Sequence, residues 1–120
     1  MSKEASKADL SQIRIALCGL NRQVLLPVRS ELMELGYHGT EWIRSDEELR
    51  IWIQKGIPDL IVADHQLNDG AAIQTVRELR NGDLGTNPFA VVIMTTWAND
   101  PANVRDAINC GVDDLLVAPY

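Results

Sequence analysis

Two polar residues follow apolar runs that read as buried strands. Asp64 ends the run from Leu60 to Ala63, and Thr95 ends the run that starts at Ala90. Short apolar runs bounded by turn residues are typical of strands covered on both faces. In open parallel sheets, ligands and chemistry gather outside the carboxyl ends of the strands. A carboxylate there could bind a ligand or react, or it could simply begin a turn, and Thr95 could be an ordinary β-branched strand residue.

The elements that must position these side chains alternate regularly along the chain. Ser45 and Glu48 form a capping box at the head of one predicted helix. The expected strands cover 13–18, 37–43, 60–63, 90–95 and 114–117, and the expected helices cover about 24–35, 45–55, 71–80 and 101–111. Five strands alternating with four helices predict an α/β fold, in which right-handed crossovers wrap helices around both sides of a parallel sheet.

The first predicted helix contains a proline. Val24, Val28, Leu32 and Leu35 recur at helical spacing and predict one inward face. Pro27 falls inside this pattern, where it removes a backbone donor and crowds the preceding turn. The helix is therefore expected either to start late, with Pro27 in its first turn, or to kink there.

Length and composition limit the function classes. The 120 residues form one expected domain at 12–120, preceded by a flexible N-terminal tail at 1–11. The net charge of -6 argues against nucleic-acid binding through this domain, because phosphate contacts need a basic surface. No apolar run approaches the roughly 18 residues of a membrane span, and no signal peptide is visible. Cys18 and Cys110 have no metal-type spacing and are interpreted as reduced, buried thiols of a cytoplasmic protein.

Three blocks of sequence carry a family resemblance through their order. They are Pro58-Asp59-Leu60-Ile61-Val62-Ala63-Asp64, then Val91-Val92-Ile93-Met94-Thr95-Thr96, then Gly111-Val112-Asp113-Asp114-Leu115-Leu116-Val117-Ala118-Pro119-Tyr120. Over about residues 12–120 the chain resembles the receiver domains of bacterial two-component response regulators. The resemblance implies a flavodoxin-like (CheY-like) doubly wound sheet of five parallel strands and a role in phosphorelay signal transduction. It also implies that Asp64 stands where the family accepts a phosphoryl group from a histidine kinase, and Thr95 where a switch hydroxyl contacts the phosphoryl oxygens.

The family's other charged groups are missing. Receivers hold Mg²⁺ with two adjacent acids after the first strand and carry a lysine at the end of the fifth. These cations neutralise charge that develops on the phosphoryl oxygens. Gly19 and Leu20 stand at the acid pair and Ala118 at the lysine. The sequence therefore resembles an atypical receiver with no expected cofactor, in which metal-assisted phosphorylation of Asp64 is lost or weak and protein contacts carry the signal.

An alternative keeps conventional phosphorylation with substitute metal ligands. Asp69 and Asp100, in loops above the sheet, could each offer a carboxylate to Mg²⁺, and Gln66 a backbone carbonyl. Trp97 could cover the site as a lid or merely pack on its loop. His65 is expected to be a partly exposed loop residue.

Two other function classes fit the residues less well. Cobalamin-binding modules of similar fold place a histidine two residues after the aspartate, whereas His65 follows Asp64 directly. The segment after the first strand contains a single glycine, Gly19, and is no dinucleotide fingerprint. The sequence shows no nucleophile elbow, metal triad or paired histidines, so an enzyme is not expected.

Protein partners are the expected ligands. The resemblance implies a histidine kinase or phosphotransfer protein, an output domain and a possible homodimer. Receivers also carry a fifth helix after the fifth strand, but this chain ends at Tyr120. It is expected to continue into a fifth helix or an output domain. Otherwise apolar surface beside the first and fifth strands would lie bare, and a second copy, an exchanged segment or a following domain would cover it.

Overall fold

Five parallel strands form one sheet in the order β2-β1-β3-β4-β5. The computed structural model describes residues 10, 12–97 and 101–118, without the side chains of residues 68, 69, 97, 103 and 118. The elements are β1 (Ile15–Cys18), α2 (Arg22–Glu34), β2 (Thr40–Ile43), α3 (Asp46–Gln54), β3 (Leu60–Asp64), the 3-10 helix η1 (Leu67–Gly70), α4 (Ala71–Arg80), β4 (Val91–Trp97), α5 (Pro101–Cys110) and β5 (Asp114–Ala118). This is the predicted α/β fold, and the helix at 71–80 has the expected bounds.

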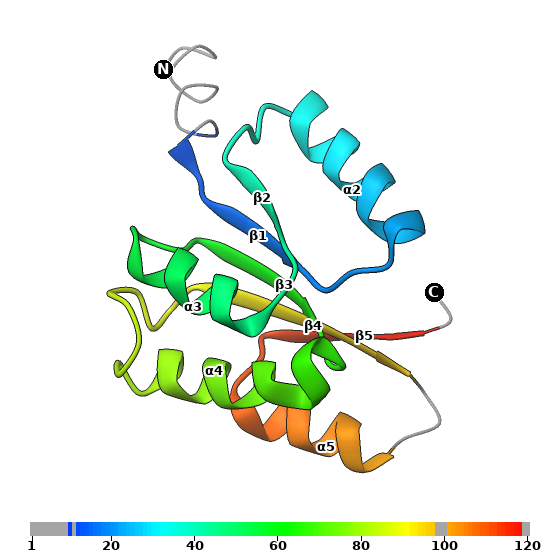
Figure 1. Ribbon diagram of the computed structural model, residues 1–120, viewed down its shortest axis with the longest axis vertical. Coiled ribbons are helices and arrows are strands. Elements are labelled where there is room, and N and C mark those ends of the chain that lie inside the picture. The colour runs from blue at the N-terminus through cyan, green and yellow to red at the C-terminus, as the bar shows by residue number, and fades with distance from the viewer. Residues whose placement is uncertain (1–9, 11, 98–100, 119–120) are drawn as a thin grey trace.

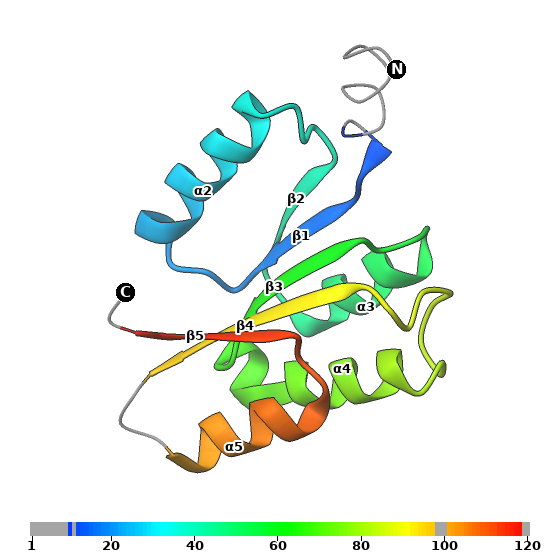
Figure 2. The ribbon, with the colours of Figure 1, turned by 180° about the vertical axis from the view of Figure 1, so that it is seen from behind.

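Helices lie on both faces of the sheet. Figures 1 and 2 show α2 on one face and α3, α4 and α5 on the other. The larger hydrophobic cluster joins the sheet to these three helices, and a smaller one joins β1 to α2. The sheet is therefore doubly wound, as predicted, with unequal layers.

The structure corrects the prediction for the first helix. The Asn21 side chain accepts a hydrogen bond from the Gln23 amide, so α2 begins at Arg22 and Pro27 lies inside it. Of the two expected alternatives, the late start is wrong, and the kink at Pro27 stays a prediction. Leu25 is the buried residue of α2, whereas Val28 and Leu35 are 37% and 62% exposed. The predicted inward face is confirmed for Leu32, which packs against the cluster of β1 and α2, and is wrong at Val28 and Leu35. Among the described elements, α2 alone covers its side of the sheet, so one of its flanks meets no other helix.

The capping box at the head of α3 is confirmed in part. The Glu48 amide donates to Ser45 Oγ at 3.1 Å, as expected. In a capping box the Glu48 side chain would accept from the Ser45 amide. Here Glu48 Oε2 accepts from the Arg44 amide instead, at 3.3 Å. The first two strands are shorter than predicted, whereas β3 includes Asp64 and β4 continues beyond Thr95.

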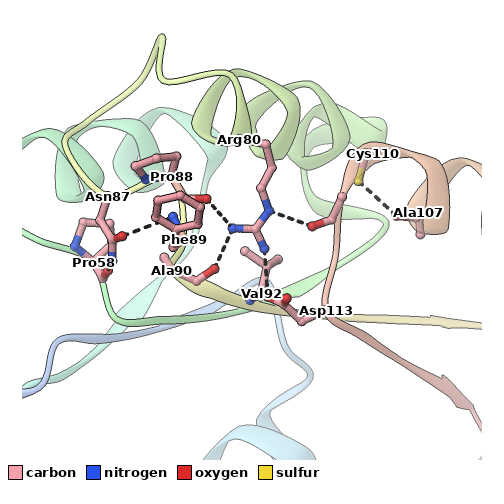
Figure 3. Close-up of polar contacts among 11 residues, drawn as sticks. Pro58, Arg80, Asn87, Pro88, Phe89, Ala90, Val92, Ala107, Cys110 and Asp113 are labelled. Carbon is pink, nitrogen blue, oxygen red and sulfur yellow. Dashed lines mark hydrogen bonds and ion pairs between the residues drawn. The ribbon is translucent and has the colours of Figure 1, made fainter.

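Arg80 ties three segments together at the amino ends of the strands. Its guanidinium donates to the main-chain oxygens of Pro88, Ala90 and Gly111, each at 2.7 Å, and to Asp113 Oδ2 at 2.8 Å (Figure 3). Asp113, which also accepts from the Val92 amide at 2.8 Å, thus has a structural role. Arg80 fixes the end of α4 to the entries of β4 and β5.

Two further polar contacts close the same edge. The Arg14 amide donates to Asp59 Oδ2 at 2.8 Å, which joins the entry of β1 to that of β3. Asn87 Nδ2 donates to the Pro58 oxygen at 2.7 Å, as Figure 3 shows. The amino-terminal edge of the sheet is therefore held by side chains as well as by the strand ladder.

One part of the sheet face on the α2 side is open. Val91 in β4 and Leu116 in β5 are 46% and 44% exposed, whereas Ile15 and Leu17 in β1 are buried against α2. The expected bare surface is confirmed for the fifth strand and wrong for the first. What covers it stays a prediction. Among the described residues, no helix has the length and apolar character needed to cross a membrane.

Candidate functional site

Asp64 and Thr95 lie side by side at the carboxyl edge of the sheet. They are register partners at the ends of the paired strands β3 and β4. Thr95 Oγ1 donates to Asp64 Oδ1 at 2.7 Å, and the Gln66 amide donates to Asp64 Oδ2 at 2.9 Å. Both carboxylate oxygens therefore accept hydrogen bonds. Asp64 is partly exposed, while Thr95 is buried.

Apolar side chains surround the chain directly after β1. Gly19 follows β1 with a φ of 66°, and a Cβ there would come within 3.0 Å of Leu67 Cδ1. Leu20 and Leu67 are 7% and 6% exposed. A carboxylate at position 19 would need both a strained backbone and the displacement of Leu67. Sequence analysis missed Leu67, whose one signal was an apolar residue inside a polar loop.

The described residues do not fit a Mg²⁺ site. Mg²⁺ prefers several oxygen ligands in octahedral geometry, at least one of them a carboxylate. No group of three His, Cys, Asp or Glu side chains in the described part of the chain is placed to hold a metal. Asp69 lies in η1, but its side chain is not described, and Asp100 lies outside the described residues. The substitute ligands stay a hypothesis.

His65 corrects another expectation, because it is buried rather than partly exposed. Its side chain is 7% exposed, and its amide donates to the Thr95 oxygen at 2.8 Å. This bond carries the pairing with β4 one residue past Asp64. Strand alternation then turns His65 to the face that also buries Ala63. Among the described residues, His65 Nδ1 has no hydrogen-bond partner.

A charged network links the first turns of α3 to the middle and the end of α4. Asp46 accepts from Thr75 Oγ1 at 2.5 Å and from Arg50 Nε at 2.9 Å, and Arg50 also pairs with Glu78 at 2.7 Å. The bonds to Glu78 and then to Asp46 raise the pKa of Arg50, and the same guanidinium lowers the pKa of Glu78. Burial, and then the charge of Asp46, raise the pKa of Cys18. Two carboxylates, Asp46 and Glu78, thus share one guanidinium in this network.

Trp97 and Ala118 end β4 and β5 and are register partners. Both belong to the predicted site edge, but their side chains are not described, so the lid hypothesis for Trp97 stays open. The structure thus brings Asp64, Thr95 and the Gln66 amide into contact, with Gly19 and Leu20 at the end of the neighbouring strand.

Comparisons in sequence point to bacterial signalling proteins. No family model matches the chain. Over 72 residues, 60% of this chain, it is 35% identical to the transcriptional regulatory protein DpiA of Escherichia coli K12. The chain spans about 30% of the length of the curated relatives that it matches.

Comparisons of structure agree with this class. The receiver domain of a signal transduction histidine kinase from Syntrophus aciditrophicus is 28% identical, with a TM-score of 0.72 over 89% of this chain and 79% of that one. The beryllofluoride-activated NtrC4 receiver domain dimer has the same fold, with 21% identity and a TM-score of 0.72 over 89% and 84%. With the sheet order and the site geometry described above, the chain has the receiver-domain fold and is similar to receiver domains of two-component signalling proteins.

Proposed function

We propose that this receiver domain signals through protein contacts and that Mg²⁺-assisted phosphorylation of Asp64 is lost or very weak. The observation that supports this most is the packing of Leu67 against Gly19, while Leu20, the next residue, is buried in the other hydrophobic cluster. Hydrocarbon takes the place at which the family's metal-binding acids would stand. The loss therefore involves the shape of the site as well as its charge.

The chemistry of phosphoryl transfer supports the same proposal. A phosphoryl group brings negative charge to the Asp64 carboxylate, so transfer depends on cations that offset the charge on the phosphoryl oxygens. Gly19, Leu20 and Ala118 supply none. The Asp64 oxygens also accept hydrogen bonds from Thr95 and Gln66, which lowers their nucleophilicity towards phosphorus.

Protein partners follow from the same class. We infer that a histidine kinase or phosphotransfer protein, an output domain, or a second copy of this chain is the ligand of this domain. The similar NtrC4 receiver was solved as a dimer, and the relative DpiA is a transcriptional regulatory protein, which supports both kinds of contact.

The test is direct phosphorylation with a small donor. The purified chain is incubated with acetyl phosphate and Mg²⁺, and its intact mass is followed against an Asp64→Asn control. We expect no stable gain of a phosphoryl group. A Mg²⁺-dependent gain that Asp64→Asn abolishes would overturn the proposal. If Asp69→Asn or Asp100→Asn also abolished that gain, the substitute-ligand alternative would be correct.

A further inference from the structure

An open groove runs between the edge strand β2 and helix α3, on the face opposite α2. β2 lies at one end of the strand order, so one of its edges has no neighbouring strand in the described sheet. The groove has a volume of about 330 Å³. Its lining consists of two tryptophans, two cations, two carboxylates and two isoleucines: Trp42, Trp52, Arg14, Lys55, Glu41, Glu48, Ile43 and Ile51.

Three groove residues form a row along α3 and its C-cap residue. Glu48, Ile51 and Lys55 are spaced by three and four residues, which places them in a row along a helix. Ile51 is 52% exposed, a large apolar side chain at the rim of the groove. Glu48 and Lys55 are also exposed. The row therefore reads acid, apolar, base along the helix axis.

The charges at the groove have no opposite charge bound to them. Among the described residues, no ion pair includes Glu48, Lys55 or Arg14. The Arg14 guanidinium lies over the Trp52 ring at 4.3 Å, and Arg14 Nη2 donates to the Trp52 oxygen at 2.7 Å. A fixed cation thus stands at the same end of the groove as Lys55, beyond the last turn of α3.

This pattern is complementary to itself under a two-fold axis. At a rise of about 1.5 Å per residue, Glu48 lies roughly 4.5 Å before Ile51 and Lys55 roughly 6 Å after it. An antiparallel copy of α3 centred on Ile51 therefore brings each Glu48 to within about 1.5 Å, along the axis, of the other copy's Lys55. Isologous dimers require such a patch, in which one surface recognises itself.

We propose that the groove between β2 and α3 docks a second copy of this chain, with the two α3 helices antiparallel. Ile51 of each copy enters the groove of the other, and Glu48 pairs with Lys55 across the axis. The inference rests on the proposed role of this domain in protein contacts and names the surface. Its test needs no phosphodonor, so its failure leaves the phosphorylation proposal intact.

The test is a charge exchange measured by sedimentation equilibrium of the full 120-residue chain at about 0.15 M salt, where the Debye length is about 8 Å. We expect the mass to rise with concentration from 13.3 kDa towards twice that value. Glu48→Lys and Lys55→Glu should each weaken association about tenfold, because each places like charges at both ends of the axis. The double variant should restore it, since the pairs re-form with their signs exchanged.

Matched controls separate this surface from others. Glu31→Lys makes the same charge change on α2, and Ile108→Gln makes the same apolar-to-polar change as Ile51→Gln on α5, where Ile108 is 59% exposed. Ile51→Gln should weaken association, whereas the two controls Glu31→Lys and Ile108→Gln should not. Circular dichroism checks that each variant folds. A monomer at all concentrations up to about 1 mM, at which even a free energy of about -4 kcal/mol would show, overturns the proposal. So does a dimer that the charge exchange leaves unchanged.

Discussion

The Thr95 hydroxyl donates a 2.7 Å hydrogen bond to Asp64 Oδ1 across the paired ends of β3 and β4. The hydroxyl proposed as a switch is thus bound to the carboxylate proposed as the acceptor. With the Gln66 amide on the other oxygen, this bond holds Asp64 in a single orientation. The contact therefore acts as a structural bond in this domain.

Removing the hydroxyl should lower stability. We expect Thr95→Val to reduce the free energy of unfolding by about 1 kcal/mol, because a buried bond to a carboxylate is lost while the shape is kept. Urea unfolding measures it. Thr96→Val is the control, since Thr96 is equally buried and makes no bond to Asp64. A coupling energy near zero between Thr95→Val and Asp64→Ala would contradict the structural role.

Adding a single methyl group at position 19 tests the apolar filling of the site. Gly19→Ala should lower the free energy of unfolding by about 2 kcal/mol, through its positive φ and its contact with Leu67. Gly82→Ala is the matched control, because Gly82 has a φ of 80° and nothing within 4 Å of the added Cβ. Equal losses at the two positions would show that Leu67 does not restrict the site.

Arg80 should be among the most sensitive charged positions. Arg80→Met removes the donor that three main-chain oxygens share and one of the two donors to Asp113 Oδ2, so we expect a loss of about 3 kcal/mol in the free energy of unfolding. Arg77→Met, on the exposed side of the same helix, should change it by less than about 0.5 kcal/mol. Thermal or urea unfolding compares the two. Similar losses would refute the special role of Arg80.

Acid should weaken the link between α3 and α4. Arg50 lowers the pKa of Glu78 in the folded state, so the folded chain holds this proton less tightly than the unfolded chain. The resulting stabilisation is complete above about pH 5 and is lost as the pH falls through the folded pKa. We expect Glu78→Gln to flatten the decline in stability between about pH 5 and 3. Glu31→Gln should leave that slope unchanged, and an unchanged slope in Glu78→Gln would disprove the link.

Both thiols should be unreactive in the folded chain. Cys18 and Cys110 are buried and free, and burial raises the pKa of each. A raised pKa removes the reactive thiolate near neutral pH. We expect no reaction with Ellman's reagent at pH 8 on the time scale of minutes, and reaction of two thiols in urea. Fast reaction of the native chain would show that the thiols are accessible.

Local sequence rules predicted the parts of the site that local structure positions. Asp64 and Thr95 each end an apolar run, and adjacent parallel strands bring such ends together. The capping bond that the Glu48 amide donates to Ser45 Oγ is equally local. These contacts follow from residue type and spacing.

The remaining features depend on contacts between distant segments. Leu67 packs against Gly19, which lies 48 positions earlier, and no periodicity encodes that meeting. His65 is buried because its amide continues the pairing with β4, a tertiary effect on a polar loop. One expected start of the first helix was too late, because it placed Pro27 in the first turn. The Asn21 cap starts the helix at Arg22, five residues before Pro27.

Two polar contacts at the amino ends of the strands, here called the polar clamps, lie apart from the candidate site. Arg80 with Asp113, and Arg14 with Asp59, secure the edge of the sheet that lies opposite Asp64. Substitutions at the carboxyl edge therefore leave these clamps untouched. The edge of the sheet that carries Asp64 can therefore vary in sequence while contacts at the opposite edge keep the strands in place.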